Sequence, residues 1–308
     1  MKDYDGEFVE KNPDDMHKRM ANECVRIEAD YKLKYNLNGS AKFLSKYGQE
    51  REDLTEAKVY SLFKEFGYII PQGSVMSSLG NHYKLASLSN CIVVPELHDS
   101  YGGVFYTDQQ LAQLFKRRCG VGVDISNLRP AGSSVSNAAG STSGAVSFMN
   151  RFSHTTREVA QNGRRGALML SMDIAHPDVE DFITIKQDLQ KVTGANISIR
   201  LSDEFMHAVE ANAEYTHKWP IESDNPKFTK TVNAKELWNT IIQCAHNTAE
   251  PGLIFWDRQH WYSTSSVYPG YKNTSTNPCS EIAMQGGDSC RLIAINLFNF
   301  VENPFTKD

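Results

Sequence analysis

Short apolar runs alternate with segments of helical periodicity from about residue 83 onward, and this alternation constrains the fold more than any other feature of the chain. Such runs are typical of strands that are buried on both faces of a sheet. They occupy residues 91–95, 166–172, 195–201, 252–256 and 292–298. Strands that alternate with helices predict an α/β fold with a parallel sheet, in which functional residues gather in the loops beyond the strand ends.

Capping signals mark the helices between these runs. Thr107 and Gln110 form a capping box, which predicts a helix that ends at Gly120. Asn233, followed three residues later by Glu236, predicts the start of another helix.

The first eighty or so residues have a different character, because they are mainly helical and moderately polar. Asn12 is suited to cap one helix, and a second helix is expected to start near Thr55 and to end at Gly67. The sequence therefore predicts a small helical domain over residues 1–80 and an α/β domain over residues 81–308.

Composition excludes several classes of protein. A net charge of −5 argues against a nucleic-acid-binding surface, although it leaves room for a local nucleotide pocket. No apolar run has the length of a membrane span and the start is acidic, so we expect a cytoplasmic protein. The six cysteines are widely spread and the histidines lack ligand spacing, so neither a disulfide framework nor a metal site is predicted.

Asn277, Cys279 and Glu281 are the strongest candidates for chemistry. Residues two apart on an extended backbone point the same way, so the amide, thiol and carboxylate can meet at one ligand. Pro278 stiffens the segment that holds the thiol. Radical reduction of a ribose requires a thiol, a base and a hydrogen-bonding amide of this kind. On spacing alone, a polar loop with a chance cysteine is an equal alternative.

Cys91 and Cys290 each flank an apolar run. Neighbouring strands of a parallel sheet lie about 5 Å apart, which is within reach of disulfide geometry. A reversible pair there would supply two electrons, although two buried structural thiols are the more economical interpretation of the residues alone.

The Gly/Ser-rich segment 133–144 and the basic turn 163–166 are weaker candidates for contacts with a nucleotide. Neither is a P-loop, since the GxxxxGK[ST] pattern is absent. Taken alone, they are a flexible loop and a pair of solvated arginines.

Several segments together resemble, in the same order, the catalytic subunit of ribonucleotide reductases, from about residue 70 to the end. They are Ser89–Cys91, Cys119–Val123, Leu128–Pro130, Ser143–Phe148, Arg164–Leu168, His176–Asp178, Asn196–Ser198 and Ser275–Ile282. The resemblance implies a ten-stranded α/β barrel of two halves, of which about the first half is present together with a finger loop.

The resemblance also implies roles for the cysteines. Cys279 falls at the tip of the finger loop as the thiyl radical, where we expect it to be buried so that the radical is not quenched. Glu281 would act as the base, Asn277 would hold the sugar, and Cys91 and Cys290 would form the redox pair that ends as a disulfide.

Binding residues are implied in the same way. Four match positions that line the substrate site: Ser74, Asn90, Cys119 and Gly120. Three others, with the loops 133–143 and 187–195, match a specificity-effector site at a dimer interface: Asp99, Ser100 and Arg129.

The implied reaction is reduction of ribonucleotides, with a deoxynucleotide or ATP as effector; diphosphate and triphosphate substrates both stay open. The chain looks most like the class that depends on adenosylcobalamin. A large subunit that depends on a dimetal radical-generating subunit is the runner-up, and a catalytically silent nucleotide-binding fragment is a further alternative.

The implied partners are a second copy of the chain and a thioredoxin- or glutaredoxin-type reductant. Because the chain ends at Asp308, we also expect it to be a fragment or one piece of a split subunit, inactive without a complementary C-terminal chain. We likewise expect the chain to lack the N-terminal ATP-binding activity domain usual in this family, for which there would be no room before residue 10.

Overall fold

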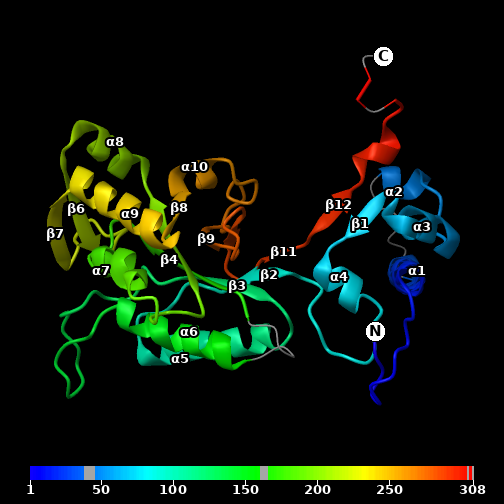
Figure 1. Cartoon of the computed structure of the whole chain (residues 1–308), viewed down its shortest axis with the longest axis horizontal. Coiled ribbons are helices and arrows are strands. Elements are labelled where there is room, and N and C mark those ends of the chain that lie inside the picture. Colours follow the sequence, from blue (N-terminus) through cyan, green and yellow to red (C-terminus); the bar gives the residue numbers. More distant parts are fainter. Residues whose placement is uncertain (38–45, 160–165, 304, 307–308) are drawn as a thin grey trace. The chain divides into compact units, whose positions relative to one another are not determined.

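The computed structural model describes residues 1–37, 46–159, 166–303 and 305–306. The chain divides into two compact units, one made of residues 1–89 and 291–308 and the other of residues 90–290 (Figure 1). The C-terminal residues therefore pack with the N-terminal ones, whereas the sequence predicts a single boundary near residue 80. That domain boundary stays a prediction for the complete protein.

The first unit is mainly helical. Its elements are α1 (Pro13–Leu37), α2 (Lys46–Glu50), α3 (Glu56–Phe63), a 3₁₀ turn (Lys64–Phe66), β1 (Ile69–Pro71), α4 (Gly73–Ser78), β12 (Ile293–Ile295) and a second 3₁₀ turn (Leu297–Phe300). Both predicted caps are confirmed. The Asn12 Oδ1 accepts a hydrogen bond from the Asp15 N–H at 3.1 Å, and the Thr55 hydroxyl accepts one from the Lys58 N–H at 3.2 Å.

The predicted strand at 292–298 is shorter in the structure than in the sequence interpretation. Only Ile293–Ile295 is extended, and it pairs antiparallel with β1, whose residues 69–71 were assigned to the helical part. This two-stranded ribbon ends in a 3₁₀ turn whose apolar side chains, Leu297 and Phe298, are exposed.

The second unit is an α/β structure around a six-stranded sheet of order β11-β2-β3-β4-β5-β8. The strands of the whole unit, which include the separate pairs β6–β7 and β9–β10, are β2 (Cys91–Val93), β3 (Gly120–Asp124), β4 (Leu168–Asp173), β5 (Asn196–Leu201), β6 (Glu214–Trp219), β7 (Phe228–Asn233), β8 (Gly252–Phe255), β9 (Asn273–Thr276), β10 (Ala283–Gln285) and β11 (Ser289–Cys290). Its α-helices are α5 (Tyr101–Phe115), α6 (Met149–Glu158), α7 (Val179–Thr184), α8 (Asp203–Ala211), α9 (Ala234–Thr248) and α10 (Trp256–Trp261).

Strands β2, β3, β4, β5 and β8 are parallel and β11 is antiparallel to β2. This confirms the predicted α/β class. The Asn233 cap is confirmed too, because its side chain accepts from the Glu236 N–H at 3.0 Å. The predicted helix start at Thr107 is wrong: α5 begins after Ser100, whose hydroxyl accepts from the Gly103 N–H, and Thr107 is buried within the helix.

The two faces of this sheet differ sharply in chemistry. Alternate residues of β3, β4 and β5 point to opposite faces. One set is apolar and joins the main hydrophobic core with α5 and α6: Val121, Val123, Leu168, Leu170, Met172, Ile197, Ile199 and Leu201. The other set is mainly small or polar, with buried Met169 as the apolar exception: Gly120, Gly122, Asp124, Met169, Ser171, Asp173, Asn196, Ser198 and Arg200. Figure 1 shows the β9–β10 hairpin over that second face, with α5 and α6 on the opposite side.

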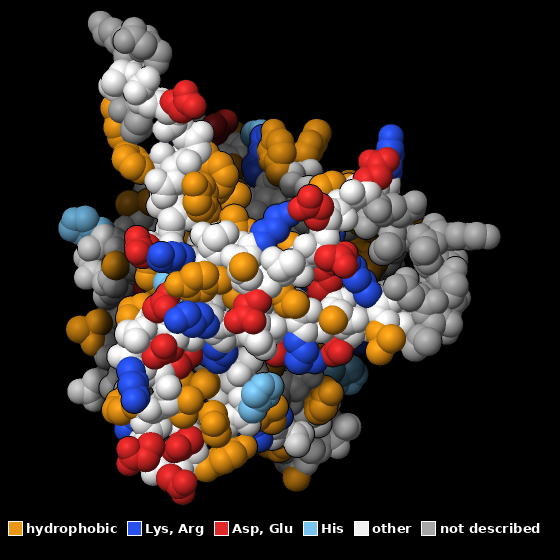
Figure 2. All heavy atoms as spheres, turned by 90° about the vertical axis from the view of Figure 1, so that its right-hand side faces the viewer, with side chains coloured by type: hydrophobic (Ala, Val, Ile, Leu, Met, Phe, Trp, Pro, Cys, Tyr) orange, Lys and Arg blue, Asp and Glu red, His pale blue; other side chains and the backbone are white. Residues whose placement is uncertain are grey.

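The described residues include no helix that is long and apolar enough to cross a bilayer. Among the same residues, no group of three or more His, Cys, Asp or Glu side chains is placed to hold a metal ion. On the face shown in Figure 2, described acidic and basic side chains are interspersed. Oppositely charged side chains also form exposed ion pairs, such as Lys18–Asp14 at 2.8 Å along α1.

His217, on β6, makes the stability of the second unit sensitive to acid. Its side chain is fully buried, and neither ring nitrogen has a hydrogen-bond partner among the described residues. Burial lowers its pKa to about 4, against 6.5 in an exposed imidazole. Between these two values the unfolded chain binds more protons than the folded chain, so stability falls as the pH drops. We expect His217 to account for a loss of about 2–3 kcal/mol between pH 7 and pH 4.

Urea unfolding followed by tryptophan fluorescence measures this loss, since all four tryptophans lie in the second unit. The His217→Leu variant should lose much less stability than the wild type over that pH range. His246→Leu, which removes an exposed imidazole from α9, is the matched control. Equal slopes for the wild type and His217→Leu would rule out this role.

Candidate active site

The candidate residues 277–281 form the tip of the β9–β10 hairpin. The two strands pair antiparallel, and at the tip the Ser280 N–H donates to the Asn277 carbonyl oxygen at 2.9 Å. Ser280 has φ +69°, a left-handed conformation that closes the turn. The Gln259 side chain, from α10, donates to the Ser280 carbonyl oxygen at 3.0 Å. The tip is therefore a defined turn.

Two glycines of β3 let this hairpin approach the sheet closely. A Cβ on Gly122 would overlap the Thr276 carbonyl oxygen, which belongs to the hairpin backbone. A Cβ on Gly120 would lie 2.9 Å from the Pro278 ring and 3.4 Å from the Cys91 sulfur. Both positions therefore require glycine, because the hairpin backbone and the Pro278 ring approach β3 too closely for any side chain. The same contacts place the hairpin tip beside Cys91.

Asn277 and Glu281 are joined directly. The Asn277 Nδ2 donates to the Glu281 Oε2 at 2.7 Å, while its Oδ1 accepts from the Ile282 N–H at 3.1 Å. Asn277 is fully buried and Glu281 is exposed. A buried amide therefore holds an accessible carboxylate in one orientation two residues after the thiol.

Cys91 and Cys290 lie directly opposite each other, as β11 pairs with β2. The sequence interpretation treated their strands as parallel neighbours; the pairing is antiparallel, because a tight turn at residues 286–288 brings the chain straight back along β2. Opposed residues of antiparallel strands have Cα atoms about 4.5–5.5 Å apart, which suits a disulfide. Both thiols are free in the structure.

The surroundings of Cys91 and Cys279 favour the protonated thiols. Burial raises the pKa of Cys91 to about 12, and the neighbouring Cys290, Cys279 and Glu281 add to the rise. Partial burial, Glu281 and Cys290 also raise the pKa of Cys279. Cys91 and Cys279 therefore carry their protons at neutral pH.

Cys279 itself is exposed, which corrects the expectation that it is buried. It lies in the tight turn at the hairpin tip, next to Pro278, which packs against Gly120 of β3. The resemblance implied a complete barrel that surrounds the sulfur.

Three of the four predicted substrate residues lie next to the thiols. Gly120 is the register partner of Cys91, and its N–H donates to the Asn90 carbonyl oxygen at 2.7 Å. Among the described residues the buried Asn90 Oδ1 has no hydrogen-bond partner, and buried Cys119 directly precedes Gly120 in sequence. Ser74 belongs to the first unit, on α4, where its hydroxyl donates to the Ser89 carbonyl oxygen at 3.5 Å.

The three predicted effector residues line one pocket of 210 Å³. The Asp99 carboxylate accepts from the Arg129 Nε at 2.7 Å and from the Arg129 backbone N–H at 3.1 Å. Ser100 caps α5 at the same place. The rest of the wall comes mainly from the Gly/Ser-rich loop and two aromatic rings: Val135, Ser136, Asn137, Ser141, Thr142, Tyr101 and Phe148. The loop 187–195 does not line this pocket, and residues 163–165 of the predicted basic turn lie outside the described part of the chain.

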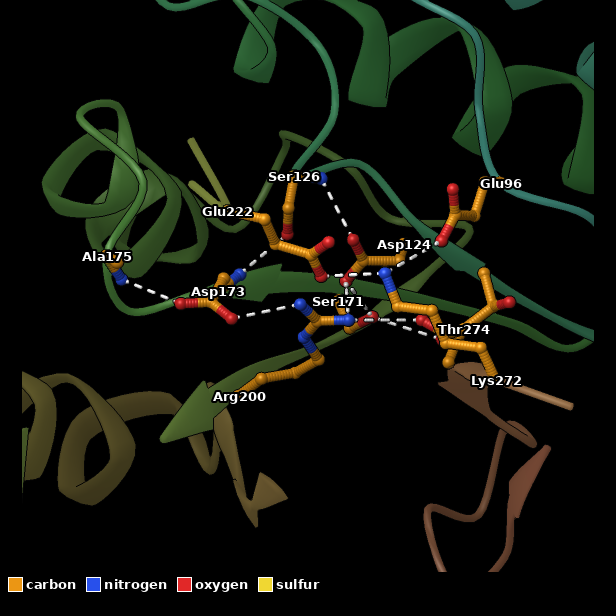
Figure 3. A network of polar contacts seen from close by, with 11 residues as sticks. Glu96, Asp124, Ser126, Ser171, Asp173, Ala175, Arg200, Glu222, Lys272 and Thr274 are labelled. Carbon is orange, nitrogen blue, oxygen red and sulfur yellow. Dashed lines mark hydrogen bonds and ion pairs between the residues drawn. The ribbon is translucent and has the colours of Figure 1, made fainter. Parts of the chain in front are cut away.

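Sequence reasoning missed a polar network at the other end of the hairpin (Figure 3). The Arg200 guanidinium donates to Asp173 at 2.9 Å and to the Thr274 carbonyl oxygen at 3.1 Å, and it lies 3.4 Å from Asp124. The Ser171 hydroxyl donates to Asp124 at 2.8 Å. Burial raises the pKa of Asp124 even though Arg200 lowers it. The only sequence signal was the period-two polarity of β3 to β5.

Comparisons with known proteins agree with this geometry. The family model "Ribonucleotide reductase, barrel domain" matches residues 89–308. The chain therefore belongs to the ribonucleotide reductase family.

Similar proteins indicate the branch of the family. The chain is 33% identical to the vitamin B12-dependent ribonucleoside-diphosphate reductase of Thermoplasma acidophilum, over 98% of this chain and 43% of that protein. It is 35% identical to the enzyme of the same name from Mycobacterium tuberculosis, over 69% of this chain and 30% of that protein. A ribonucleoside-diphosphate reductase large subunit of Trypanosoma brucei brucei is 25% identical, over 83% and 34%. The chain thus spans less than half the length of these relatives.

Proposed function

We propose that this chain forms the thiol-bearing half of the catalytic barrel of a ribonucleotide reductase. The observation that carries the proposal is the meeting of Cys279, Asn277 and Glu281 with the opposed pair Cys91 and Cys290 at one end of the sheet. Membership of the family supports it. The substrate would be a ribonucleotide, to which the Asn90 Oδ1, unpartnered among the described residues, offers a polar contact.

Membership of the family implies a reaction in which each of these groups has a role. The Cys279 sulfur, as a thiyl radical, removes the hydrogen atom from the ribose C3′, while the Glu281 carboxylate accepts the proton of the 3′ hydroxyl. Asn277 keeps that carboxylate in place. Cys91 or Cys290 protonates the departing 2′ hydroxyl, which leaves as water. The second thiol gives its hydrogen to C2′, so that the two thiols supply two electrons and become a disulfide. Glu281 returns its proton to the 3′ oxygen, and the Cys279 thiol returns its hydrogen atom to C3′.

Radical initiation has to reach Cys279 from outside the described residues, and the exposed sulfur fits such a source. Adenosylcobalamin supplies an unpaired electron when it is bound, and the relatives with the higher identities are named as vitamin B12-dependent. We assign no described residue to the corrin ring. A dimetal small subunit is the second candidate, supported by the similarity to the Trypanosoma large subunit.

Regulation and partners follow from two surfaces of the second unit. The 210 Å³ pocket with Asp99, Ser100 and Arg129 is proposed to bind a nucleotide effector, because a guanidinium and a helix N-terminus both suit phosphate.

On α5, exposed Tyr101, Phe105 and Tyr106 offer an apolar surface for a second copy. A complementary chain that completes the barrel and a dithiol reductant of the thioredoxin or glutaredoxin type are the remaining partners.

Single turnover of the assembled catalytic subunit, without external reductant, tests this function. We expect one equivalent of deoxynucleotide per catalytic chain and, by peptide mass spectrometry, one disulfide between Cys91 and Cys290. Cys290→Ser should form no such disulfide and should lose nearly all of this product. Cys244→Ser, which alters a buried thiol on α9, is the matched control. Full product formation with Cys91 and Cys290 still reduced would contradict the proposal.

A further inference from the structure

The hairpin that carries Cys279 is held on the sheet at two places. Near its tip the contacts are steric, since Gly120 and Gly122 provide a smooth surface against Pro278 and Thr276. Strand β9 runs back from there over β3, so Thr274 lies near Asp124 at the opposite end of that strand. A glycine surface permits close approach, but it offers no side chain that would stop the hairpin from sliding along β3.

The second place is polar and directional. The Arg200 Nη1 donates to the Thr274 carbonyl oxygen at 3.1 Å, and the Ser171 and Ser275 hydroxyls are hydrogen-bonded to each other at 3.1 Å. These bonds join β5 and β4 to two consecutive residues of β9. Each bond requires one register of the hairpin. A one-residue slip would turn the Ser275 side chain to the opposite side of β9, and it would replace the Thr274 carbonyl by a neighbouring one that points the other way.

Arg200 is itself fixed from three directions. Asp173 on β4 and Asp124 on β3 hold its guanidinium, and the Trp256 ring of α10 lies 4.5 Å below it (Figure 3 shows the two carboxylates). A planar guanidinium satisfies several acceptors in a fixed geometry, which a lysine ammonium cannot reproduce. Arg200 therefore transmits the positions of β3 and β4 to the backbone of β9.

A shift at Thr274 reaches the reacting sulfur. Thr274 precedes Cys279 by five residues, and extended chain rises about 3.3 Å per residue. A slip of one residue would thus move the sulfur by about 3 Å, which is enough to impair a hydrogen transfer whose partners must lie within about 3–3.5 Å.

We propose that Arg200 is the positioning residue that sets the register of the β9–β10 hairpin, and with it the place of Cys279 relative to Cys91 and Cys290. This inference rests on the proposed function, because the position of Cys279 matters for catalysis only if its sulfur reacts. Arg200 touches the hairpin backbone and acts through Cys279.

The Arg200→Lys variant of this chain tests the inference without turnover. Lysine keeps a positive charge between Asp124 and Asp173, which avoids leaving two buried carboxylates unpaired, but it loses the fork that reaches Thr274. The readout is the rate of Cys279 alkylation by iodoacetamide as a function of pH, measured by peptide mass spectrometry. We expect the midpoint of the profile to fall and the rate at pH 8 to rise about threefold or more, because the sulfur loses the partial burial that raises its pKa and leaves the neighbourhood of Cys290.

An internal reference separates positioning from general loosening of the sheet. The Cys91–Cys290 disulfide, formed with diamide, depends on the β2–β11 register and should form to the same extent in Arg200→Lys and wild type. Arg258→Lys is the matched control. It alters an exposed ion pair between Arg258 of α10 and Asp203 of α8, and it should leave the Cys279 profile unchanged.

Ser275→Ala provides a second variant that leaves the buried charges intact and removes only the bond to Ser171. It should move the Cys279 profile in the same direction by a smaller amount, and it decides the question if Arg200→Lys does not fold. Unchanged profiles in the folded variants would overturn the inference, as would joint loss of the Cys91–Cys290 disulfide. Turnover that survives Cys279→Ser would refute the proposed function, while the thiol profiles would still report on the register.

Discussion

Replacing Cys279 by serine is expected to abolish deoxynucleotide formation by the assembled catalytic subunit, with a loss of about a thousandfold or more. A hydroxyl has nearly the size of a thiol, so the turn closed by Ser280 and the Asn277–Glu281 hydrogen bond should persist. The O–H bond is too strong for an oxygen radical to be formed and exchanged with the ribose at modest cost. The measurement is the initial rate of deoxynucleotide formation.

Two further measurements test whether the loss of activity is specific to the Cys279 sulfur. Binding of a deoxynucleotide effector to the pocket around Asp99 and Arg129 should stay within about twofold of wild type, because none of the residues lining that pocket belongs to the hairpin. Cys24→Ser, in α1 of the first unit, is the matched thiol control and should keep full activity. Turnover retained by Cys279→Ser would refute the radical role.

Replacing Gly122 by alanine is expected to have the largest effect on structure. The new methyl group would overlap the Thr276 carbonyl oxygen, and a backbone atom of a paired strand cannot turn aside as a flexible side chain can. We expect the second unit to lose about 3 kcal/mol or more of unfolding free energy, or the hairpin to lift away from the sheet with loss of catalytic activity. Urea unfolding monitored by tryptophan fluorescence measures the first effect and turnover the second.

Gly102 is the matched control. It lies in the first turn of α5, and the nearest atom to an added Cβ is the Ser100 hydroxyl oxygen at 3.8 Å. Gly102→Ala should therefore be neutral or slightly stabilising, by up to about 1 kcal/mol, because alanine favours the helix. A Gly122→Ala protein as stable and active as Gly102→Ala would show that the hairpin does not pack against β3 in this way.

Local chemistry made much of the fold predictable. The strands β4, β5 and β8 are short apolar or alternating segments, and the caps at Asn12, Thr55 and Asn233 act within a few residues. Strand β3 was not recognised, because two of its five residues are glycines that make room for the hairpin. The start of α5 was misplaced for a similar reason, since Gly102 and Gly103 hide its first turn.

The candidate site was predictable to the extent that it is local. Asn277, Cys279 and Glu281 are close in sequence, and the pairing of Cys91 with Cys290 was expected from the family resemblance. Arg200 escaped notice because its partners are distant, with Asp173 27 residues and Thr274 74 residues away. The exposure of Cys279 was also missed, since the family pattern describes a barrel that surrounds the sulfur.

The contrast between the two faces of the sheet bears on how a complementary chain would bind. The face beneath the hairpin carries mainly glycine, serine, aspartate and arginine, and its polar groups bond to one another or to the hairpin. If a complementary chain completes the barrel, as proposed, it would meet a polar lining and not an apolar one. Closure would then expel hydrating water from polar groups, so we expect the affinity to come mainly from strand edges and exposed aromatic rings.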